Sequence, residues 1–257
     1  MLGAMSFEYL SVEEARARPG LRMVVVGKVP SPWGEAAKNI FHMKGIDFAA
    51  VRLVYDNEAL KHWAGQLSGP VAIFNDEPPR ANWDEILMLA ERLADTPVLV
   101  PVKQRNEGLA LCGKFCGKGG LGWHRRLQLV HGGLTGTGGF GERVAAYLGG
   151  KYGYDPAHAE SDAAAVHRLL GEFAGMLRAQ RDAGRHYYLG ELSAADVYSA
   201  TFMALLKPLP QEHCDMHPSI RAALESLDEP TARALDPILL EHRDMMYSRH
   251  FPLPLSL

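Results

Sequence analysis

Residues 22–38 run from a β-branched apolar segment directly into a helix start, and this arrangement limits the folds open to the chain. The segment reads Arg22-Met-Val-Val-Val-Gly-Lys-Val-Pro-Ser-Pro-Trp-Gly-Glu-Ala-Ala-Lys38. It predicts a strand over 22–27, followed by Ser31 as the N-cap of a helix and by Pro32, whose fixed φ suits the first turn. Because the first helical turn has unpaired N–H groups, the sequence predicts that this corner stabilises an anion.

The elements around this corner alternate in type, which indicates a small α/β domain. Hydrophobic periodicity predicts helix 32–44, strand 48–54 and a helical segment over 57–64, which together with the first strand make a βαβ unit. Gly69-Pro70 then precedes a third apolar strand over 71–74, a hairpin follows, and another helix opens at Asn82. Near the amino terminus, Ser11 and Glu14 form a capping-box pattern that predicts a short helix leaning on this domain.

The second half of the chain predicts helices only. Residues 94–101 contain two prolines between periodic regions, as expected of a linker. Asp155-Pro156 can start a long helix that Gly184 can close. Its predicted buried stripe consists of Val166, Leu169, Leu170, Phe173 and Leu177. We therefore expect an α/β domain followed by an all-α domain.

Charge and composition argue against several classes of partner. The formal net charge is −3 and no long Lys/Arg block occurs, so we expect neither nucleic acid nor an anionic membrane as the main partner. No apolar run approaches the ~20 residues of a membrane span, and early glutamates argue against a signal peptide, which favours a cytoplasmic protein. The three cysteines have no disulfide-framework spacing, and we expect Cys112 and Cys116 to be small buried side chains.

Three motifs together resemble the cytosolic glutathione S-transferase superfamily of the serine type. They are the Ser31 corner, the segment Lys44-Gly-Ile-Asp-Phe48, and the capping motif Tyr188-Leu-Gly-Glu-Leu-Ser-Ala-Ala-Asp196. The resemblance implies a thioredoxin-like glutathione-binding domain over 21–94, a linker over 95–103 and an all-α domain over 104–257 that contributes the acceptor-substrate pocket. Residues 1–20 would then be an extension containing the short helix.

The resemblance also implies a chemical role for Ser31. A free thiol has a pKa of about 8.5, and a hydroxyl donor at a helix N-terminus favours the thiolate. Ser31 would hold the thiolate of glutathione, with Trp33 beside it in the glutathione-binding site. The alternative is that Ser31 only caps the helix.

Further glutathione-binding positions follow from the same resemblance. Pro70 would be cis, although most X-Pro bonds are trans, and Gly69 would offer its backbone to the cysteine moiety. At the N-terminus of the next helix, Asn82 would bind the γ-glutamyl carboxylate and Asp84 or Glu85 the ammonium. Trp83 would also belong to the glutathione-binding site. The alternative is an ordinary capping box with Trp83 packed against it, because the acidic or amide residue followed by serine that relatives carry is missing here.

Trp123 and Arg126 are the candidate residues of the acceptor pocket, with a packed tryptophan and a solvated arginine as the alternative. Two other patterns carry less weight. The glycines of 136–141 spell a dinucleotide fingerprint but follow no predicted strand, and His213 and His217 lie in a proline-flanked stretch typical of a loop. We therefore expect neither a nucleotide nor a metal.

The resemblance thus implies a homodimeric transferase of a detoxification type, which takes glutathione as co-substrate and transfers it to a hydrophobic electrophile or cleaves an ether or thioether. A transferase-fold binding or scaffold protein without turnover is the alternative, supported by the missing pair at the helix that Asn82 opens. A thioredoxin-type oxidoreductase is disfavoured because Ser-Pro-Trp-Gly, and not Cys-x-x-Cys, occupies 31–34.

Overall fold

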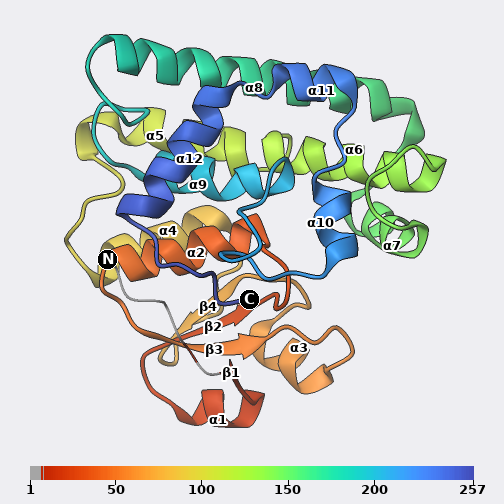
Figure 1. The fold of residues 1–257 in the computed structure, drawn as a ribbon. Helices are drawn as coiled ribbons and strands as arrows, with labels where there is room; N and C mark the ends of the chain where they lie inside the picture. Colours follow the sequence, from red (N-terminus) through yellow and green to blue (C-terminus); the bar gives the residue numbers. More distant parts are fainter. Residues whose placement is uncertain (1–6, 8) are drawn as a thin grey trace.

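A computed structural model describes residue 7 and residues 9–257, which form a small sheet layer beneath a larger set of helices (Figure 1). The strands are β1 (Tyr9–Leu10), β2 (Leu21–Val25), β3 (Phe48–Arg52) and β4 (Val71–Phe74). They lie in the order β1-β3-β2-β4, with β2 parallel to β3 and antiparallel to β4. The long connection between the parallel strands β2 and β3 contains helix α2 (Pro32–Met43), as a βαβ unit requires.

Each face of the sheet has its own apolar core. Helices α2 and α4 (Trp83–Leu93) cover the face directed toward the other helices, and their buried side chains join one large core with them. On the other face, α1 (Val12–Ala17) and α3 (Glu58–Ala64) lie over a smaller core that includes Ala15, Leu60, Val24 and Val51. Because β2 is central and covered on both faces, all five of its residues are buried.

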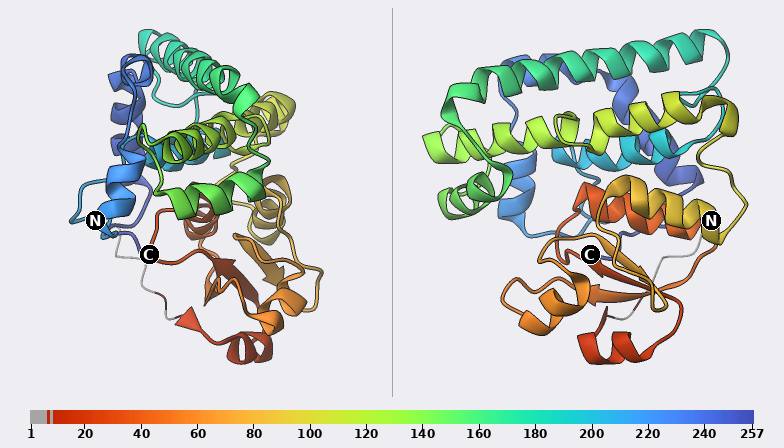
Figure 2. Two further views of the ribbon diagram at one scale, coloured as in Figure 1. Left: turned by 90° about the vertical axis from the view of Figure 1, so that its right-hand side faces the viewer. Right: turned by 180° about the vertical axis from the view of Figure 1, so that it is seen from behind.

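The helical part follows a segment, 95–101, that contains no helix or strand. Its helices are α5 (Arg105–Cys116), α6 (Leu121–Thr135), α7 (Glu142–Tyr152), α8 (Ala159–Asp182), α9 (Ala194–Phe202), α10 (Pro218–Leu224), α11 (Glu229–Ala234) and α12 (Pro237–Arg249), with 3₁₀ turns η1 (Val102–Gln104), η2 (Pro156–His158) and η3 (Met203–Leu205). Figure 2 shows α5 and α6 following one another roughly along one line beside α8. Helix α9 is buried along its whole length and packs against α2, α5 and α12.

The predicted helices and strands are confirmed with one correction. The hairpin expected after β4 is reduced to an isolated bridge between Ala72 and Arg80 and adds no strand to the sheet. Pro78 and Pro79 have no N–H for a ladder. The fourth strand is instead β1, from the amino-terminal segment that the sequence assigned only a helix, and it pairs in parallel with β3.

The helical signals in the second half are also confirmed. All five residues of the predicted stripe on α8 are buried. Before α9, the Asp196 carboxylate accepts bonds from the Ser193 N–H at 2.9 Å and from the Ser193 hydroxyl at 2.8 Å, as the capping motif predicts. This motif fixes the start of the helix against which α2 packs, so it helps to position the Ser31 corner.

Candidate active site

Ser31 occupies the N-cap position of α2, but its hydroxyl makes no hydrogen bond to the helix. The backbone has the extended conformation of an N-cap, and the Ser31 carbonyl accepts the first helical bond from Glu35 N at 2.8 Å. Ser11 on α1 behaves differently, since its hydroxyl accepts from Glu14 N at 3.2 Å. The Ser31 side chain is partly exposed, so its hydroxyl is free to donate to a ligand in front of the helix.

The Gly69–Pro70 peptide bond is cis and directly precedes β4. A Cβ built on Gly69 would lie 3.4 Å from the Val24 carbonyl oxygen and 3.5 Å from Val26 N, so this turn packs against the end of β2. The same strand end leads into the loop that carries Ser31. The fold therefore brings Ser31 and Gly69 to the same edge of the sheet.

The first turn of α4 is used partly for packing. Asn82 N donates to Glu85 Oε2 at 3.2 Å, which is one bond of the capping box. The Trp83 ring meets the Tyr198 ring edge-on with centroids 5.8 Å apart, and the Tyr198 hydroxyl donates to the Trp83 carbonyl at 3.2 Å. Trp83 thus ties α4 to α9, while Asn82 and Asp84 are exposed on the first turn.

Trp33 extends from the start of α2 toward the helical part. Its Nε1 donates to the Cys116 carbonyl at 2.8 Å, and its ring meets Phe202 edge-on at 4.8 Å. The Arg126 guanidinium lies over the same ring, 5.0 Å from its centroid. The structure therefore brings together three of the predicted side chains, because Trp123 lies one turn before Arg126 on α6.

Three further side chains complete this group, and sequence reasoning did not identify them. Tyr152 at the end of α7 lies 5.1 Å from the Arg126 guanidinium and meets Trp123 edge-on at 5.0 Å. Lys151 lies over the rings of Tyr152 and Tyr55, at 5.9 and 5.6 Å. We call Trp33, Tyr55, Trp123, Arg126, Lys151 and Tyr152 the Arg126 cluster. The sequence Lys-Tyr-Gly-Tyr at 151–154 was the signal that could have identified two of these residues. Only the packing of α7 against α6 brings their side chains close to Arg126.

The cysteines take no part in this site. All three are free and buried, and burial raises the pKa of the Cys112 and Cys116 thiols well above the ordinary value and that of Cys214 to about 12. A thiol must ionise to act as a nucleophile or a metal ligand, so burial disfavours both roles for these side chains at neutral pH.

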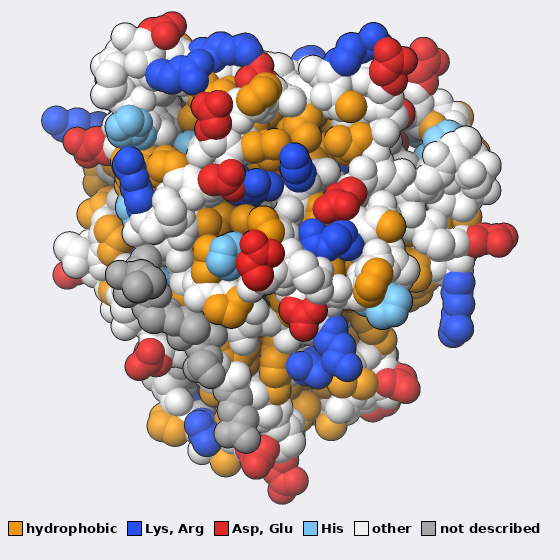
Figure 3. Space-filling model, viewed as in Figure 1, with side chains coloured by type: hydrophobic (Ala, Val, Ile, Leu, Met, Phe, Trp, Pro, Cys, Tyr) orange, Lys and Arg blue, Asp and Glu red, His pale blue; other side chains and the backbone are white. Residues whose placement is uncertain are grey.

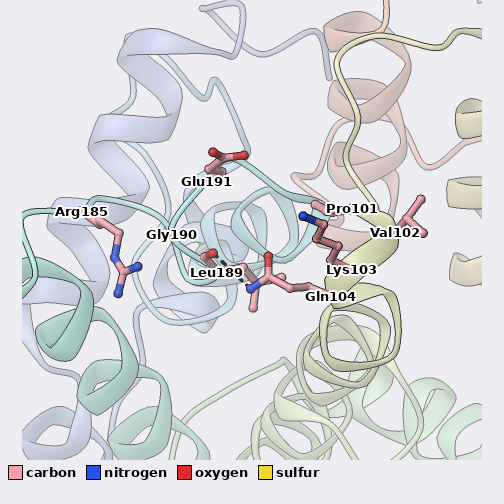
Figure 4. Close-up of a pocket in the computed structure, with 8 residues that line it drawn as sticks. All are labelled: Pro101, Val102, Lys103, Gln104, Arg185, Leu189, Gly190 and Glu191. Carbon is pink, nitrogen blue, oxygen red and sulfur yellow. Dashed lines mark hydrogen bonds between the residues drawn. The ribbon is translucent and has the colours of Figure 1, made fainter.

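A separate pocket opens between the segment after α4 and the loop before α9 (Figure 4). Gln104 Nε2 donates to the Leu189 carbonyl at 3.3 Å across it. None of the predicted site residues lines this pocket, whose lining residues are Pro101, Val102, Lys103, Gln104, Arg185, Leu189, Gly190 and Glu191.

Within the described part of the chain, no three His, Cys, Asp or Glu side chains gather closely enough to hold a metal ion. The histidines of the 213–217 segment lie before α10, where His217 Nδ1 accepts from Ser219 N at 3.2 Å.

Of the helices described for residues 9–257, none is both long and apolar enough to cross a bilayer. On the face drawn in Figure 3, Lys and Arg side chains are interspersed with Asp and Glu side chains.

Comparison with solved structures decides the fold. A glutathione transferase family member from Pseudomonas fluorescens, solved with two glutathione bound, superposes with a TM-score of 0.61 at 14% identity over 95% of this chain and 98% of that one. This chain has the glutathione transferase fold. No protein-family model matches the sequence, and no curated protein sequence matches it.

Other glutathione transferases show the same likeness. One from Methylobacterium radiotolerans, in complex with glutathione sulfonate, has a TM-score of 0.57 at 17% identity, covering 92% of this chain and 96% of that one. One from Rhodospirillum rubrum has a TM-score of 0.56 at 20% identity, covering 90% of each chain. The predicted fold class, a thioredoxin-like domain followed by a helical domain, is therefore confirmed, and the glutathione transferase fold is shared over nearly the full chain.

Proposed function

We propose that this protein binds glutathione, stabilises its thiolate with the Ser31 hydroxyl and transfers it to an electrophile. The observation that carries the proposal is the Ser31 hydroxyl itself, which stands at the N-terminus of a 12-residue helix without a capping bond. A hydroxyl that only capped the helix would bond to the N2 or N3 backbone N–H. Here Ser31 is partly exposed and its hydroxyl lies at the positive end of α2, and both the hydroxyl donor and this helix end favour a thiolate.

The tripeptide would lie along the edge of the sheet that Ser31 and Gly69 share. The Gly69 backbone would hold the cysteine moiety, and Asn82 and Asp84 on the exposed first turn of α4 would hold the γ-glutamyl carboxylate and ammonium. Trp123 and Arg126 would border the acceptor. Several of the fold neighbours were solved with glutathione or a glutathione analogue, which supports the proposal that this protein binds glutathione.

The reaction we propose is attack of the thiolate on an electrophilic carbon, or thiol-dependent cleavage of an ether or thioether. In the first case a C–S bond forms, the leaving group departs with the bonding electrons, and the thiol proton passes to solvent. We further propose a homodimer in the cytoplasm, with residues 95–103 as the linker between the two domains.

The test is calorimetric titration of glutathione into the wild-type protein and Ser31→Ala, with thiolate absorbance of the bound tripeptide followed across pH. We expect saturable binding, a lowered thiol pKa in the wild type and a return toward the free value of about 8.5 in the variant. Ser11→Ala is the matched control, because it removes an N-cap hydroxyl on the far side of the sheet. Equal thiol pKa values in wild type and Ser31→Ala would contradict the role of Ser31.

A binding or scaffold protein without turnover is the second candidate. It is favoured by the first turn of α4, where Glu85 is engaged in capping and Trp83 in packing against Tyr198. This candidate predicts normal folding with weak or no glutathione binding, which the same titration measures.

A further inference from the structure

The Arg126 cluster joins two parts of the fold through aromatic and cationic side chains. Tyr55 comes from the loop between β3 and α3 and Trp33 from the start of α2, whereas the other four members belong to α6 and α7. Tyr55 also meets Tyr147 on α7 edge-on, with centroids 5.7 Å apart. Tyr55 is 46% exposed and Tyr147 52% exposed, so large aromatic surface is accessible beside the cations.

Among the described residues, Arg126 lacks the hydrogen-bond acceptor that a half-buried guanidinium normally has. Its guanidinium lies between the rings of Trp33 and Tyr152, and within the part of the chain that the structure describes it makes no ion pair. Its Nε is buried and has no hydrogen-bond acceptor. Among the described residues, no acceptor therefore competes with an anion from outside the chain for the Arg126 guanidinium.

The neighbouring Arg125 shows what a structural arginine looks like on the same helix. Arg125 is buried, and its guanidinium donates to the carbonyls of Leu205 at 3.0 Å and Ser226 at 2.7 Å and to Gln128 Oε1 at 2.7 Å. Its donors are used to join α6 to the segments after α9 and α10. Arg126 has no such bonds, although it lies one residue away.

Lys151 places a second positive charge beside Arg126. Its Nζ donates to Ser68 Oγ at 3.1 Å, immediately before the cis Gly69–Pro70 turn. The Lys151 Nζ and the Arg126 guanidinium lie 5.9 and 5.1 Å from the centroid of the same Tyr152 ring, and burial and the neighbouring Arg126 both lower the pKa of Lys151. No carboxylate lies within 4.0 Å of Lys151 among the described residues, whereas Lys38, Lys44 and Lys114 each have one.

We propose that the Arg126 cluster is a subsite for the carboxylate of an aromatic acceptor, with Arg126 and Lys151 holding the anion and the surrounding rings stacking on the acceptor. This inference rests on the proposed transferase function. A guanidinium can hold a carboxylate through two parallel hydrogen bonds, and aromatic side chains pack favourably against an aromatic ligand. The cluster extends from the Trp33 ring of α2 to Lys151, which bonds to the Ser68 hydroxyl. The aromatic ring of the bound acceptor would therefore lie beside the sheet edge where the thiolate is proposed.

A matched pair of substrates tests the proposal. The first is 4-chloro-3-nitrobenzoate and the second is its methyl ester, which has the same reacting carbon and leaving group but no charge. In both, the thiolate forms a C–S bond, the C–Cl bond breaks and chloride leaves with the bonding electrons. Each value of kcat/KM is divided by the rate constant of the uncatalysed reaction with glutathione, which removes the difference in electrophilicity.

We expect the wild-type protein to prefer the acid over the ester by about tenfold or more, the size of one charge-assisted hydrogen bond. Arg126→Gln should lose this preference, because kcat/KM falls by a larger factor for the acid than for the ester, and Arg126→Lys should retain part of it. Arg168→Gln is the control, because Arg168 is an exposed arginine on α8 whose side chain pairs with Glu172. Equal use of acid and ester by the wild type, or an equal loss of both in Arg126→Gln, would overturn the proposal.

A binding experiment separates this inference from the transferase function. Titration with 4-nitrobenzoate and with methyl 4-nitrobenzoate, in the absence and presence of the inert S-methylglutathione, requires no turnover. Binding of the acid that is at least tenfold tighter than that of the ester, and lost in Arg126→Gln, would support the subsite even if no conjugate forms. Active conjugation without this preference would overturn the subsite alone, and failure of the acid to bind under either condition would overturn it as well.

Discussion

Glu35 and Lys38 form an ion pair within α2, with Oε1 and Nζ 2.5 Å apart and both side chains at most 4% exposed. Lys38 Nζ also donates to the Ser256 carbonyl at 2.8 Å, so the pair ties the end of the chain to the helix that begins at Ser31. A buried ion pair requires such additional bonds to offset the desolvation of both charges.

Removal of one partner of this pair should destabilise the protein strongly. Lys38→Met leaves the Glu35 carboxylate buried without a counter-charge, so we expect a loss of about 3–5 kcal/mol in the free energy of unfolding. The double variant Glu35→Gln/Lys38→Met should recover much of that loss, since it leaves no buried charge. Urea denaturation of the three proteins measures these differences, and a double variant less stable than Lys38→Met would contradict the account.

The same glutamate should make stability depend on pH. Burial raises the pKa of Glu35, against the opposing attraction of Lys38. The folded state therefore binds the proton more tightly than the unfolded state, and this contribution to stability is present at low pH and lost as pH rises from the unfolded value of about 4.3 through the folded pKa. Glu35→Gln should remove this decline, which denaturation at a series of pH values from 4 upward would detect as a flatter profile than that of wild type.

Two serine substitutions should affect different properties, one the stability of the protein and the other the thiol pKa of bound glutathione. The Ser11 hydroxyl accepts from Glu14 N and donates to its carboxylate, so Ser11→Ala should lower stability by about 1 kcal/mol and leave glutathione binding unchanged. The Ser31 hydroxyl makes no bond to its helix, so Ser31→Ala should change stability by less than about 0.5 kcal/mol while changing the thiol pKa of bound glutathione. Thermal denaturation together with the thiolate titration compares the two, and a larger stability loss in Ser31→Ala than in Ser11→Ala would favour a purely capping role.

Asp196 is a fully buried carboxylate whose acceptors are all in use. Besides both bonds from Ser193, it accepts from Tyr188 N at 3.0 Å and lies 3.1 Å from His242 Nε2 on α12. Asp196→Ala should cost about 3 kcal/mol or more, because several buried donors lose their acceptor, whereas Ser193→Ala should cost about 1 kcal/mol. Equal losses in the two variants, measured by urea denaturation, would show that capping alone explains the role of the carboxylate.

Local signals were sufficient to predict most of the fold. Each of three local patterns marks a helix start, and each helix starts at or within a few residues of the predicted position: Ser31-Pro32, Asp155-Pro156 and the Ser193 motif. Strand β1 was missed because its two residues pair only with β3, about forty residues away, and such pairing leaves no local pattern.

The candidate site also has a part that local sequence signals predict and a part that depends on tertiary contacts. The position of Ser31 follows from its own helix, but whether its hydroxyl bonds to that helix depends on the side-chain conformation, which the residue type does not determine. Arg126 could be singled out from the sequence, whereas its partners Tyr152 and Lys151 depend on how α7 returns beside α6, which is a tertiary contact. Sequence periodicity reports which face of a helix is buried, and it does not report which other helix covers that face.

Gly122 connects the helical core to the proposed site. A Cβ at this position on α6 would overlap the Phe202 ring, with Cδ1 at 2.6 Å, and would lie 3.1 Å from the Trp33 ring. Gly122→Ala should therefore destabilise the protein by about 1–3 kcal/mol, since Phe202 is fully buried and has little room to move. Gly122→Ala/Phe202→Leu should recover part of this loss, because the smaller side chain makes room for the added methyl group.

Helix α6 offers a matched control for this prediction. Gly133→Ala would place its methyl group against Phe140 O and Ala145 at the other end of the helix, away from Trp33. Both single variants should lower the melting temperature, but only Gly122→Ala should shift the fluorescence of Trp33, measured against the Trp33→Phe protein. If both variants shift it equally, the overlap is relieved by movement of the whole helix and the contact between Gly122, Phe202 and Trp33 does not set the position of the indole.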